Sequence, residues 1–494
     1  MPCPPLSVVH SGGRPLVFAV AVLALGLGWT GAAEPEHESL EGSDWPGLTF
    51  HAPPKRLAPE AVTEPWPRFL GPHDNGVSRE TPILTNWPES GPPKVWEARK
   101  GSGYTSPSIA RGVLVLFHRI GDSEQIDGLH PETGRRFWSH RYPVEYRDRY
   151  GYNDGPRASP VIDGARVYLL GVAAALHCLD LATGRVLWKR DLRTDFRVPQ
   201  NFFGAGPSPL VYKDLLILNL GGRDPDGESL CVAALDKHTG AFVWGVPGPW
   251  GASYASPVTV ALRGKDRILV LAGGESRPPD GGLLCIDPSD GAVDFRFPWR
   301  SGKYESVNAS TPVAIDSSRV FISECYSRGG VLLEIGEDLQ PRPVWTARDF
   351  GMHWSTPLFV DGHLYGYQGR NEPDAFLACL DATTGEERWR EALEWDVKVK
   401  DPRGRERTFR WGMFRGSLLR VDNRFVALGE LGTLALLDLN PEGAAVRRRA
   451  DLFHARETWS LPPLHRGLLY VSQHSPDLLD DTPPRLICYD LRGE

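Results

Sequence analysis

The side chains best suited to chemistry lie just ahead of a Ser-Pro dipeptide that recurs along the chain. Guanidinium groups bind carboxylates and phosphates through paired hydrogen bonds, and aromatic side chains line most small-molecule sites. Arg157 and Arg415 therefore suit a carboxylate or phosphate, and the aromatic residues nearby suit a planar ligand. The predicted ligand-binding residues, which would share one opening, are Arg157, Asn201, Tyr254, Glu305, Asn308, His353, Arg415 and Trp459.

These residues can also be explained without a ligand, and the sequence favours this structural explanation. Residues at the mouth of a channel are polar because they face water, and Arg/Glu pairs join neighbouring repeats. A second polar cluster, from Tyr367 to Glu372, holds two amides, a guanidinium and a carboxylate. A structural loop explains that cluster more simply than ligand contact.

Signatures of catalysis and metal binding are missing from the sequence. It contains no His-Glu-x-x-His, no Gly-x-Ser-x-Gly, no phosphate loop and no Gly-x-Gly-x-x-Gly after a strand. Glu305 and Asn308 offer two oxygen donors, whereas calcium takes about six to eight. We therefore predict no catalytic residue, no metal ligand and no cofactor.

The candidate residues are positioned by a repeat that runs through most of the chain. Its clearest copy begins at Ser159-Pro160 and ends with Cys178-Leu179-Asp180 and the turn leading to Trp188. The steps average about 51 residues, which is typical of propeller blades rather than helical repeats. The eight units start at positions 107, 160, 209, 257, 312, 357, 418 and 462.

A turn of the form Asp-x-x-Thr-Gly, followed by a Trp four residues after the Gly, marks the outer part of most units. The Asp side chain is expected to cap backbone N–H groups, and the Gly to adopt a positive φ. The Trp is large enough to wedge between blades, so this motif is structural. The Gly/Trp pairs are Gly134/Trp138, Gly184/Trp188, Gly240/Trp244 and Gly385/Trp389.

The two ends of the repeat array predict how the ring closes. The last unit stops after Cys488-Tyr489-Asp490, before any Gly-x-x-x-Trp strand, while Lys94-Val95-Trp96-Glu97 forms a spare strand of that type. Pairing the two would remove the exposed edges. We predict an all-β fold, an eight-bladed β-propeller of four-stranded antiparallel blades closed by an N-terminal strand.

The N-terminal region carries an export signal. A nearly wholly apolar run of about 14 residues, from Pro15 to Gly28, is too short to span a bilayer, and Gly31-Ala32-Ala33 suits a signal peptidase. We predict a signal peptide over 1–33, a loose linker over 34–65 and one propeller domain over 66–494, with residues 66–90 lying over the ring. The alternative is an uncleaved N-terminal anchor.

The net charge limits the classes of partner, and the positions of the cysteines indicate whether they form disulfides. A formal charge of −7 argues against non-specific nucleic-acid binding, which needs a basic face. Cys178, Cys285, Cys379 and Cys488 occupy equivalent positions in successive units, which are too far apart for disulfides. We predict buried free thiols in a monomeric protein that lies in the periplasm or outside the cell and has no membrane span after signal cleavage.

The repeated Asp-x-x-Thr-Gly-x-x-x-Trp phrase resembles the pyrroloquinoline-quinone (PQQ)-like repeat of quinoprotein-dehydrogenase-type propellers, over residues 95–491. The resemblance implies an eight-bladed fold, and in the dehydrogenases an aromatic floor for PQQ, a catalytic Asp, a calcium ion and a pair of adjacent bridged cysteines. This sequence has no Cys-Cys pair. The resemblance also covers relatives without a quinone, including an outer-membrane assembly scaffold.

Three functions follow from these observations. The leading one is an exported, non-enzymatic binding or scaffold protein, whose protein partner or small anionic or planar ligand binds at the channel mouth or blade rims. The alternative is a PQQ-dependent oxidoreductase of the alcohol or sugar dehydrogenase type, with PQQ and Ca. A glycan or peptidoglycan binder is the third.

Overall fold

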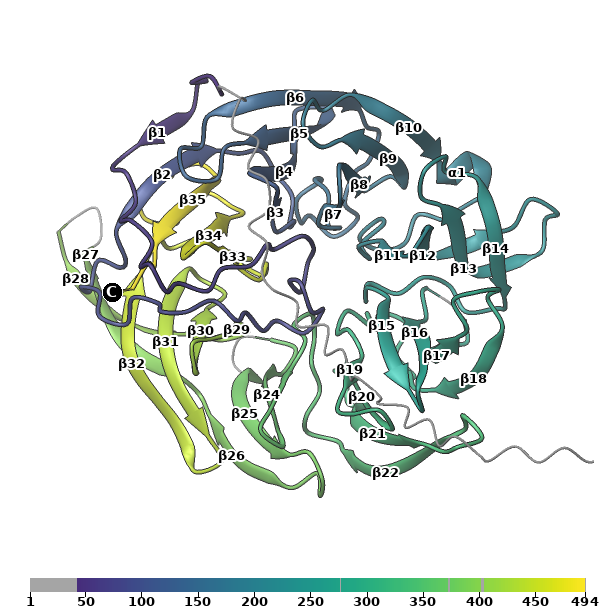
Figure 1. Ribbon diagram of the computed structural model, residues 1–494. Helices are drawn as coiled ribbons and strands as arrows, with labels where there is room; N and C mark the ends of the chain where they lie inside the picture. Colours follow the sequence, from purple (N-terminus) through teal and green to yellow (C-terminus); the bar gives the residue numbers. More distant parts are fainter. Residues whose placement is uncertain (1–41, 276, 372–373, 401–403, 494) are drawn as a thin grey trace, which may run out of the picture. The chain divides into compact units, whose positions relative to one another are not determined.

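Eight antiparallel β-sheets form a ring of blades around a central axis (Figure 1). The computed structural model describes residues 42–275, 277–371, 374–400 and 404–493, which belong to one compact unit of the chain, residues 37–494. In each blade the first strand lies innermost, and the next strands follow outward in chain order. This architecture confirms the predicted fold class.

The first four blades are built from consecutive strands, with one helical turn between the second and third. Blades 1 and 2 comprise β3 (Ser108–Ala110), β4 (Val113–Ile120), β5 (Ser123–Leu129) and β6 (Arg136–Pro143), then β7 (Val161–Asp163), β8 (Arg166–Leu170), β9 (Ala175–Asp180) and β10 (Val186–Asp191), followed by α1 (Leu192–Asp195). Blades 3 and 4 comprise β11 (Leu210–Tyr212), β12 (Leu215–Arg223), β13 (Ser229–Asp236) and β14 (Phe242–Pro247), then β15 (Val258–Leu262), β16 (Lys265–Ala272), β17 (Gly282–Ile286) and β18 (Val293–Pro298).

The remaining blades follow the same order, interrupted by one extra hairpin. Blades 5 and 6 comprise β19 (Val313–Ala314), β20 (Arg319–Glu324), β21 (Gly329–Ile335) and β22 (Pro341–Ala347), then β23 (Leu358–Val360), β24 (His363–Gln368), β25 (Phe376–Asp381) and β26 (Glu387–Glu391). The hairpin β27 (Glu394–Lys400) and β28 (Glu406–Gly412) precedes blade 7, which comprises β29 (Ser417–Val421), β30 (Arg424–Leu428), β31 (Thr433–Asn440) and β32 (Gly443–Asp451). Blade 8 contains β33 (Leu464–His465), β34 (Leu468–Gln473) and β35 (Arg485–Asp490).

The eighth blade is completed from the N-terminal side, as predicted. Strand β2 (Lys94–Arg99) pairs antiparallel with β35, and Trp96 lies opposite Cys488. A further strand, β1 (Leu48–Phe50), pairs with the outer edge of β2. The prediction of a loose linker is therefore wrong for this part of residues 34–65, because backbone pairing with β2 orders it. The predicted signal peptide lies outside the described residues.

Each turn glycine contacts the tryptophan of the preceding blade. Gly134 and Gly184 have positive φ values of +69° and +68°, and any Cβ there would overlap the indoles of Trp96 and Trp138. Each of these indoles also donates a hydrogen bond into the same turn, to Pro131 O (2.8 Å) and Leu181 O (2.9 Å). The predicted wedge is thus confirmed, and it joins one blade to the next.

The segment before β2 lies across the end of the channel where the first two strands of each blade turn. Trp66 exchanges backbone hydrogen bonds with Ile109 of β3, and Ser78 N donates to Arg420 O of β29 (2.8 Å). The carboxylate of Glu80 accepts from the backbone N–H groups of Arg466 and Gly467 (2.7 Å each). These contacts hold the segment against blades 1, 7 and 8.

The six cysteines of the described part, Cys178, Cys231, Cys285, Cys325, Cys379 and Cys488, are all buried and unpaired. Their burial within the blades fits the prediction from repeat spacing. Among the described residues, no helix is long and apolar enough to cross a membrane.

Candidate functional site

The Ser-Pro dipeptides set up a ring of residues around the axis. Four of these Ser and Thr hydroxyls accept a hydrogen bond from the backbone of the preceding blade, at 2.9–3.0 Å, which ties neighbouring blades together close to the channel. The pairs are Ser106 N to Ser159 Oγ, Ser159 N to Ser208 Oγ, Ser208 N to Ser256 Oγ and Thr311 N to Thr356 Oγ1. Side chains just ahead of these positions therefore converge on one opening.

A cavity of about 520 Å³ lies where these segments converge. Its lining comes from the approaches to all eight inner strands, from loops between the second and third strands, and from Phe69 of the segment that crosses the other end of the channel. A space of this size fits a small organic ligand.

Six of the eight predicted residues line this cavity: Arg157, Tyr254, Glu305, His353, Arg415 and Trp459. Asn201 and Asn308 do not. The amide of Asn201 donates to Ala252 O (3.3 Å), and that of Asn308, in the orientation that satisfies both groups, donates to Glu324 (3.0 and 3.2 Å). Both asparagines are buried and support the wall from behind it.

One side of the cavity is aromatic, and two of its residues, Tyr150 and Tyr152, were not predicted from the sequence. Tyr150 and Tyr152 precede blade 2, and Phe202 and Phe203 precede blade 3. The ring of Phe203 lies 5.6 Å from each of the two tyrosine rings and 5.7 Å from the ring of Tyr254. Edge and tilted contacts at these spacings are favourable for aromatic pairs, so this wall offers an apolar aromatic surface.

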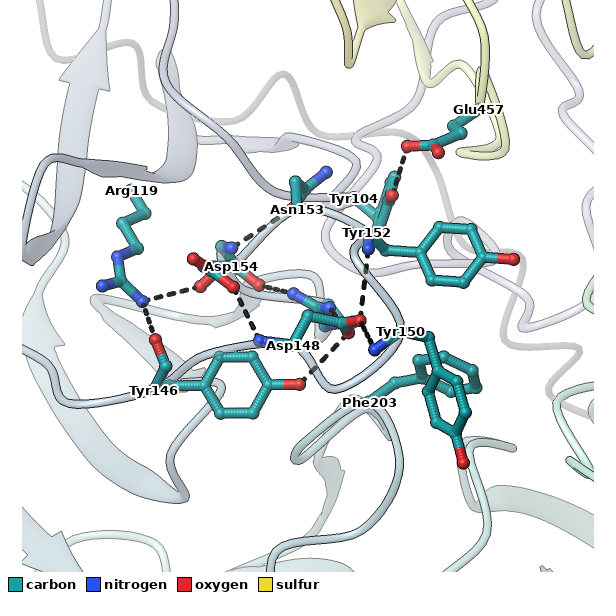
Figure 2. A network of polar contacts seen from close by, with 12 residues as sticks. Tyr104, Arg119, Tyr146, Asp148, Tyr150, Tyr152, Asn153, Asp154, Phe203 and Glu457 are labelled. Carbon is teal, nitrogen blue, oxygen red and sulfur yellow. Dashed lines mark hydrogen bonds and ion pairs between the residues drawn. The ribbon is translucent and has the colours of Figure 1, made fainter. Parts of the chain in front are cut away.

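The loop that carries these tyrosines is fixed by Asp148, as Figure 2 shows. One oxygen of the Asp148 carboxylate accepts from the backbone N–H groups of Tyr150 (2.9 Å) and Tyr152 (3.2 Å). The other accepts from Tyr146 Oη (3.3 Å) and from the guanidinium of Arg157 (2.9 Å). The two tyrosines, 56% and 40% exposed, are therefore held at the mouth on an ordered loop.

The opposite side of the cavity is polar and contains a chain of hydrogen bonds. Arg415 forms an ion pair with Glu430 and lies 3.2 Å from His353 Nδ1. His353 Nε2 lies 3.1 Å from the hydroxyl of Tyr326. Burial, together with the positive charges of Arg415 and Arg370, lowers the pKa of His353 to about 3, so its imidazole is neutral at physiological pH.

Between the two sides lie Trp459 and Tyr104. Their ring centroids are 5.0 Å apart, and the indole N–H of Trp459 donates to Glu430 Oε1 (2.8 Å). The hydroxyl of Tyr104 donates a hydrogen bond to Glu457. Burial raises the pKa of Glu457, although the hydrogen bond from Tyr104 opposes this.

A buried basic pair lies behind this part of the wall. Lys100 Nζ is 3.2 Å from His474 Nδ1, and His474 Nε2 is 2.8 Å from the hydroxyl of Ser460, which lines the cavity. Burial lowers the pKa of Lys100 to about 7. The pKa of His474 is also well below its ordinary value, because of burial and the charge of Lys100.

The oxygen donors at the cavity do not fit a calcium ion beside a quinone. Both oxygens of Glu430 are used by Arg415, and one also accepts from Trp459. Glu457 is engaged by Tyr104, and among the described residues Glu305 is the one acidic side chain in the lining itself, whereas calcium needs about six to eight oxygens. Within the described ranges, no group of three or more His, Cys, Asp or Glu side chains is arranged to hold a metal ion.

Comparison with known proteins identifies the family. A family model described as "Outer membrane protein assembly factor BamB" matches residues 122–391, more than half of the chain. The chain belongs to this family of PQQ-like repeat propellers. A search of curated proteins finds no match.

Solved structures share the fold at low sequence identity. BamB from Moraxella catarrhalis aligns with a TM-score of 0.52 and 14% identity, over 81% of this chain and 98% of that one. A europium-containing methanol dehydrogenase gives 0.60 and 12%, over 86% and 98%. The quinohemoprotein alcohol dehydrogenase from Comamonas testosteroni gives 0.58 and 13%, over 87% and 81%. At such identities the likeness shows the fold alone.

Proposed function

We propose that this protein is an exported binding protein that holds a small planar ligand in its axial cavity. The observation that carries the proposal is the cavity of about 520 Å³, with a wall of aromatic rings facing a wall of hydrogen-bonding groups. Export rests on the N-terminal signal sequence, with cleavage after Ala33.

A binding role is favoured over quinone-dependent catalysis by the state of the cavity's charged groups. A dehydrogenase of this fold needs a carboxylate base and oxygen ligands for its metal ion. Here the carboxylates of Glu430 and Asp148 are held by Arg415 and Arg157, and Glu457 accepts from Tyr104. Groups engaged in this way position the wall and are poorly placed to take a proton from a substrate.

Titration with the neutral fluorescent dye N-phenyl-1-naphthylamine tests the proposal. We expect saturable binding of one dye molecule per protein, with energy transfer from tryptophan because Trp354 and Trp459 line the cavity. Phe203→Ala should weaken binding about tenfold, because it removes an aromatic contact surface. Val344→Ala, on the exposed outer strand β22, is the control and should bind like the wild type.

Two results would count against the proposal. Binding that survives Phe203→Ala unchanged would place the dye outside the cavity. A visible cofactor spectrum after incubation with PQQ and calcium, with reduction of a redox dye by an alcohol, would establish the alternative dehydrogenase function.

A further inference from the structure

The two walls of the cavity differ in a way that orients a ligand. Blades 2 to 4 supply the aromatic side, including Tyr152, Phe203 and Tyr254, whereas blades 5 to 7 supply Tyr326, Arg370 and other hydrogen-bonding groups. A ligand with one flat apolar part and one polar part therefore has a preferred direction.

The position of the proton on the His353 imidazole determines whether the hydroxyl of Tyr326 donates into the cavity. A guanidinium only donates hydrogen bonds, so His353 Nδ1 accepts from Arg415 (3.2 Å). The neutral imidazole then carries its proton on Nε2, which donates to the hydroxyl oxygen of Tyr326 (3.1 Å). The hydroxyl hydrogen of Tyr326 has no acceptor among the described residues, so it is left for a group inside the cavity.

Arg370 differs from the other two arginines of the cavity. Arg157 is paired with Asp148 and Arg415 with Glu430, whereas Arg370 forms no ion pair with any carboxylate in the described part of the chain. Its guanidinium lies over the ring of Tyr326, with Cζ 4.4 Å from the centroid. Its positive charge is thus placed beside the hydroxyl that donates into the cavity.

We infer that the ligand is an aromatic anion, with its carboxylate, sulfonate or phosphate bound by Arg370 and Tyr326 and its ring against the Phe203 wall. This inference rests on the proposed binding function and names the ligand class of the same cavity. A charged acceptor satisfies the tyrosine hydroxyl and the guanidinium together, and hydrogen bonds to ionised groups are the stronger ones.

Glu305 supplies an internal check on this electrostatic argument. Its exposed carboxylate also lines the cavity and contributes to raising the pKa of Tyr326. Since it repels an incoming anion, removing its charge should strengthen anion binding, whereas removing the charge of Arg370 should weaken it.

A pair of dyes that differ in one charged group tests the inference. The full-length protein is titrated with 1-anilinonaphthalene-8-sulfonate and with N-phenyl-1-naphthylamine, which lacks the sulfonate. We expect tighter binding of the sulfonate by the wild type, and a loss of about tenfold or more for that dye alone in Arg370→Gln. Tyr326→Phe should weaken the sulfonate by a smaller factor, and Glu305→Gln should strengthen it about twofold.

The controls separate failure of this inference from failure of the proposed function. Arg342→Gln, which removes a surface arginine of β22 that is 60% exposed, should change neither affinity. Equal affinity for both dyes in the wild type, or equal losses in Arg370→Gln, would overturn the anion assignment while leaving the cavity a binding site. Failure of both dyes to bind the wild type would overturn the binding function itself.

Discussion

Lys100 is a buried amine behind the wall of the cavity, and its environment makes stability depend on pH. Its side chain donates to Gly101 O (3.3 Å) and Gly103 O (3.2 Å) and faces His474. Burial lowers its pKa from 10.5 to about 7. Between these values the unfolded chain binds a proton that the folded protein does not, so this group makes stability rise with pH.

Lys100→Met should remove that contribution. Below pH 7 Lys100 is protonated in both the folded and the unfolded wild type, so the full cost of burying its charge is present. The free energy of unfolding of the variant should therefore exceed that of the wild type by most at these pH values. The advantage should shrink between pH 7 and 10, by up to about 1.4 kcal/mol per pH unit. Urea unfolding of both proteins at pH 6.5, 8 and 9.5 measures the difference.

Lys265→Met provides the matched control, because Lys265 is exposed at the start of β16. Its stability difference from the wild type should not vary over this range. A constant difference for Lys100→Met would show that the amine keeps its charge in the folded protein.

Residue types and repeat positions predicted many of the residues at the cavity. They did not predict that one side of the cavity would be aromatic and the opposite side polar. The approach to each Ser-Pro dipeptide was identifiable, so Arg157, Glu305, His353 and Arg415 could be placed at the opening. Tyr326 lies in the β20–β21 turn, outside that pattern, and no periodic signal indicates its contact with His353. Such contacts depend on how blades are spaced across the axis.

The turns between strands require glycine for two separate reasons, a positive φ and close contact with a neighbouring blade. Gly184 has a φ of +68°, and a Cβ there would overlap the indole of Trp138. Gly164 also has a positive φ, +55°, but a Cβ there would meet no atom within 4 Å. Comparing substitutions at Gly184 and Gly164 therefore separates the cost of backbone strain from the cost of the lost fit between blades.

Gly184→Ala should destabilise the protein by about 2–4 kcal/mol, the sum of left-handed strain and overpacking. Gly164→Ala should cost about 1 kcal/mol from strain alone. Chemical denaturation of both variants gives the comparison. Equal losses would mean that the indole moves aside without cost and that the wedge adds little to stability.

The blades were predictable because the same short signals recur, whereas the irregular elements were not. Repeated Asp-x-x-Thr-Gly turns gave the outer hairpins, and the missing last strand pointed to Lys94–Glu97. The hairpin β27–β28 has no counterpart in the other units, and β1 lies in a Pro-rich, charged stretch that resembles a linker in composition. Strand β1 is ordered by its pairing with β2, about 45 residues further along the chain, whereas β27 and β28 pair with each other in a sheet of their own.

For the whole molecule, ring closure depends on one strand far from its partner in sequence. Trp96 of β2 is fully buried, and its indole donates to Pro131 O (2.8 Å), which joins blade 8 to blade 1. Trp96→Ala should cost about 3–5 kcal/mol. Trp389, at the same repeat position in blade 6, is only half-buried, so Trp389→Ala should cost clearly less.

Thermal unfolding followed by circular dichroism compares the two tryptophan variants. A larger drop in melting temperature for Trp96→Ala is expected. If the two drops are equal, the joint between blades 8 and 1 is no more important than the other joints.

The pairing of β2 with β35 also determines when the ring can close. Strand β2 leaves the ribosome long before its partner β35, because seven whole blades lie between them in the sequence. Until then, β2 must remain unpaired on that side through translation and any passage across a membrane. The nascent chain therefore carries an unpaired β2 edge, open to proteases and to wrong pairing, until the blades between β2 and β35 have been made.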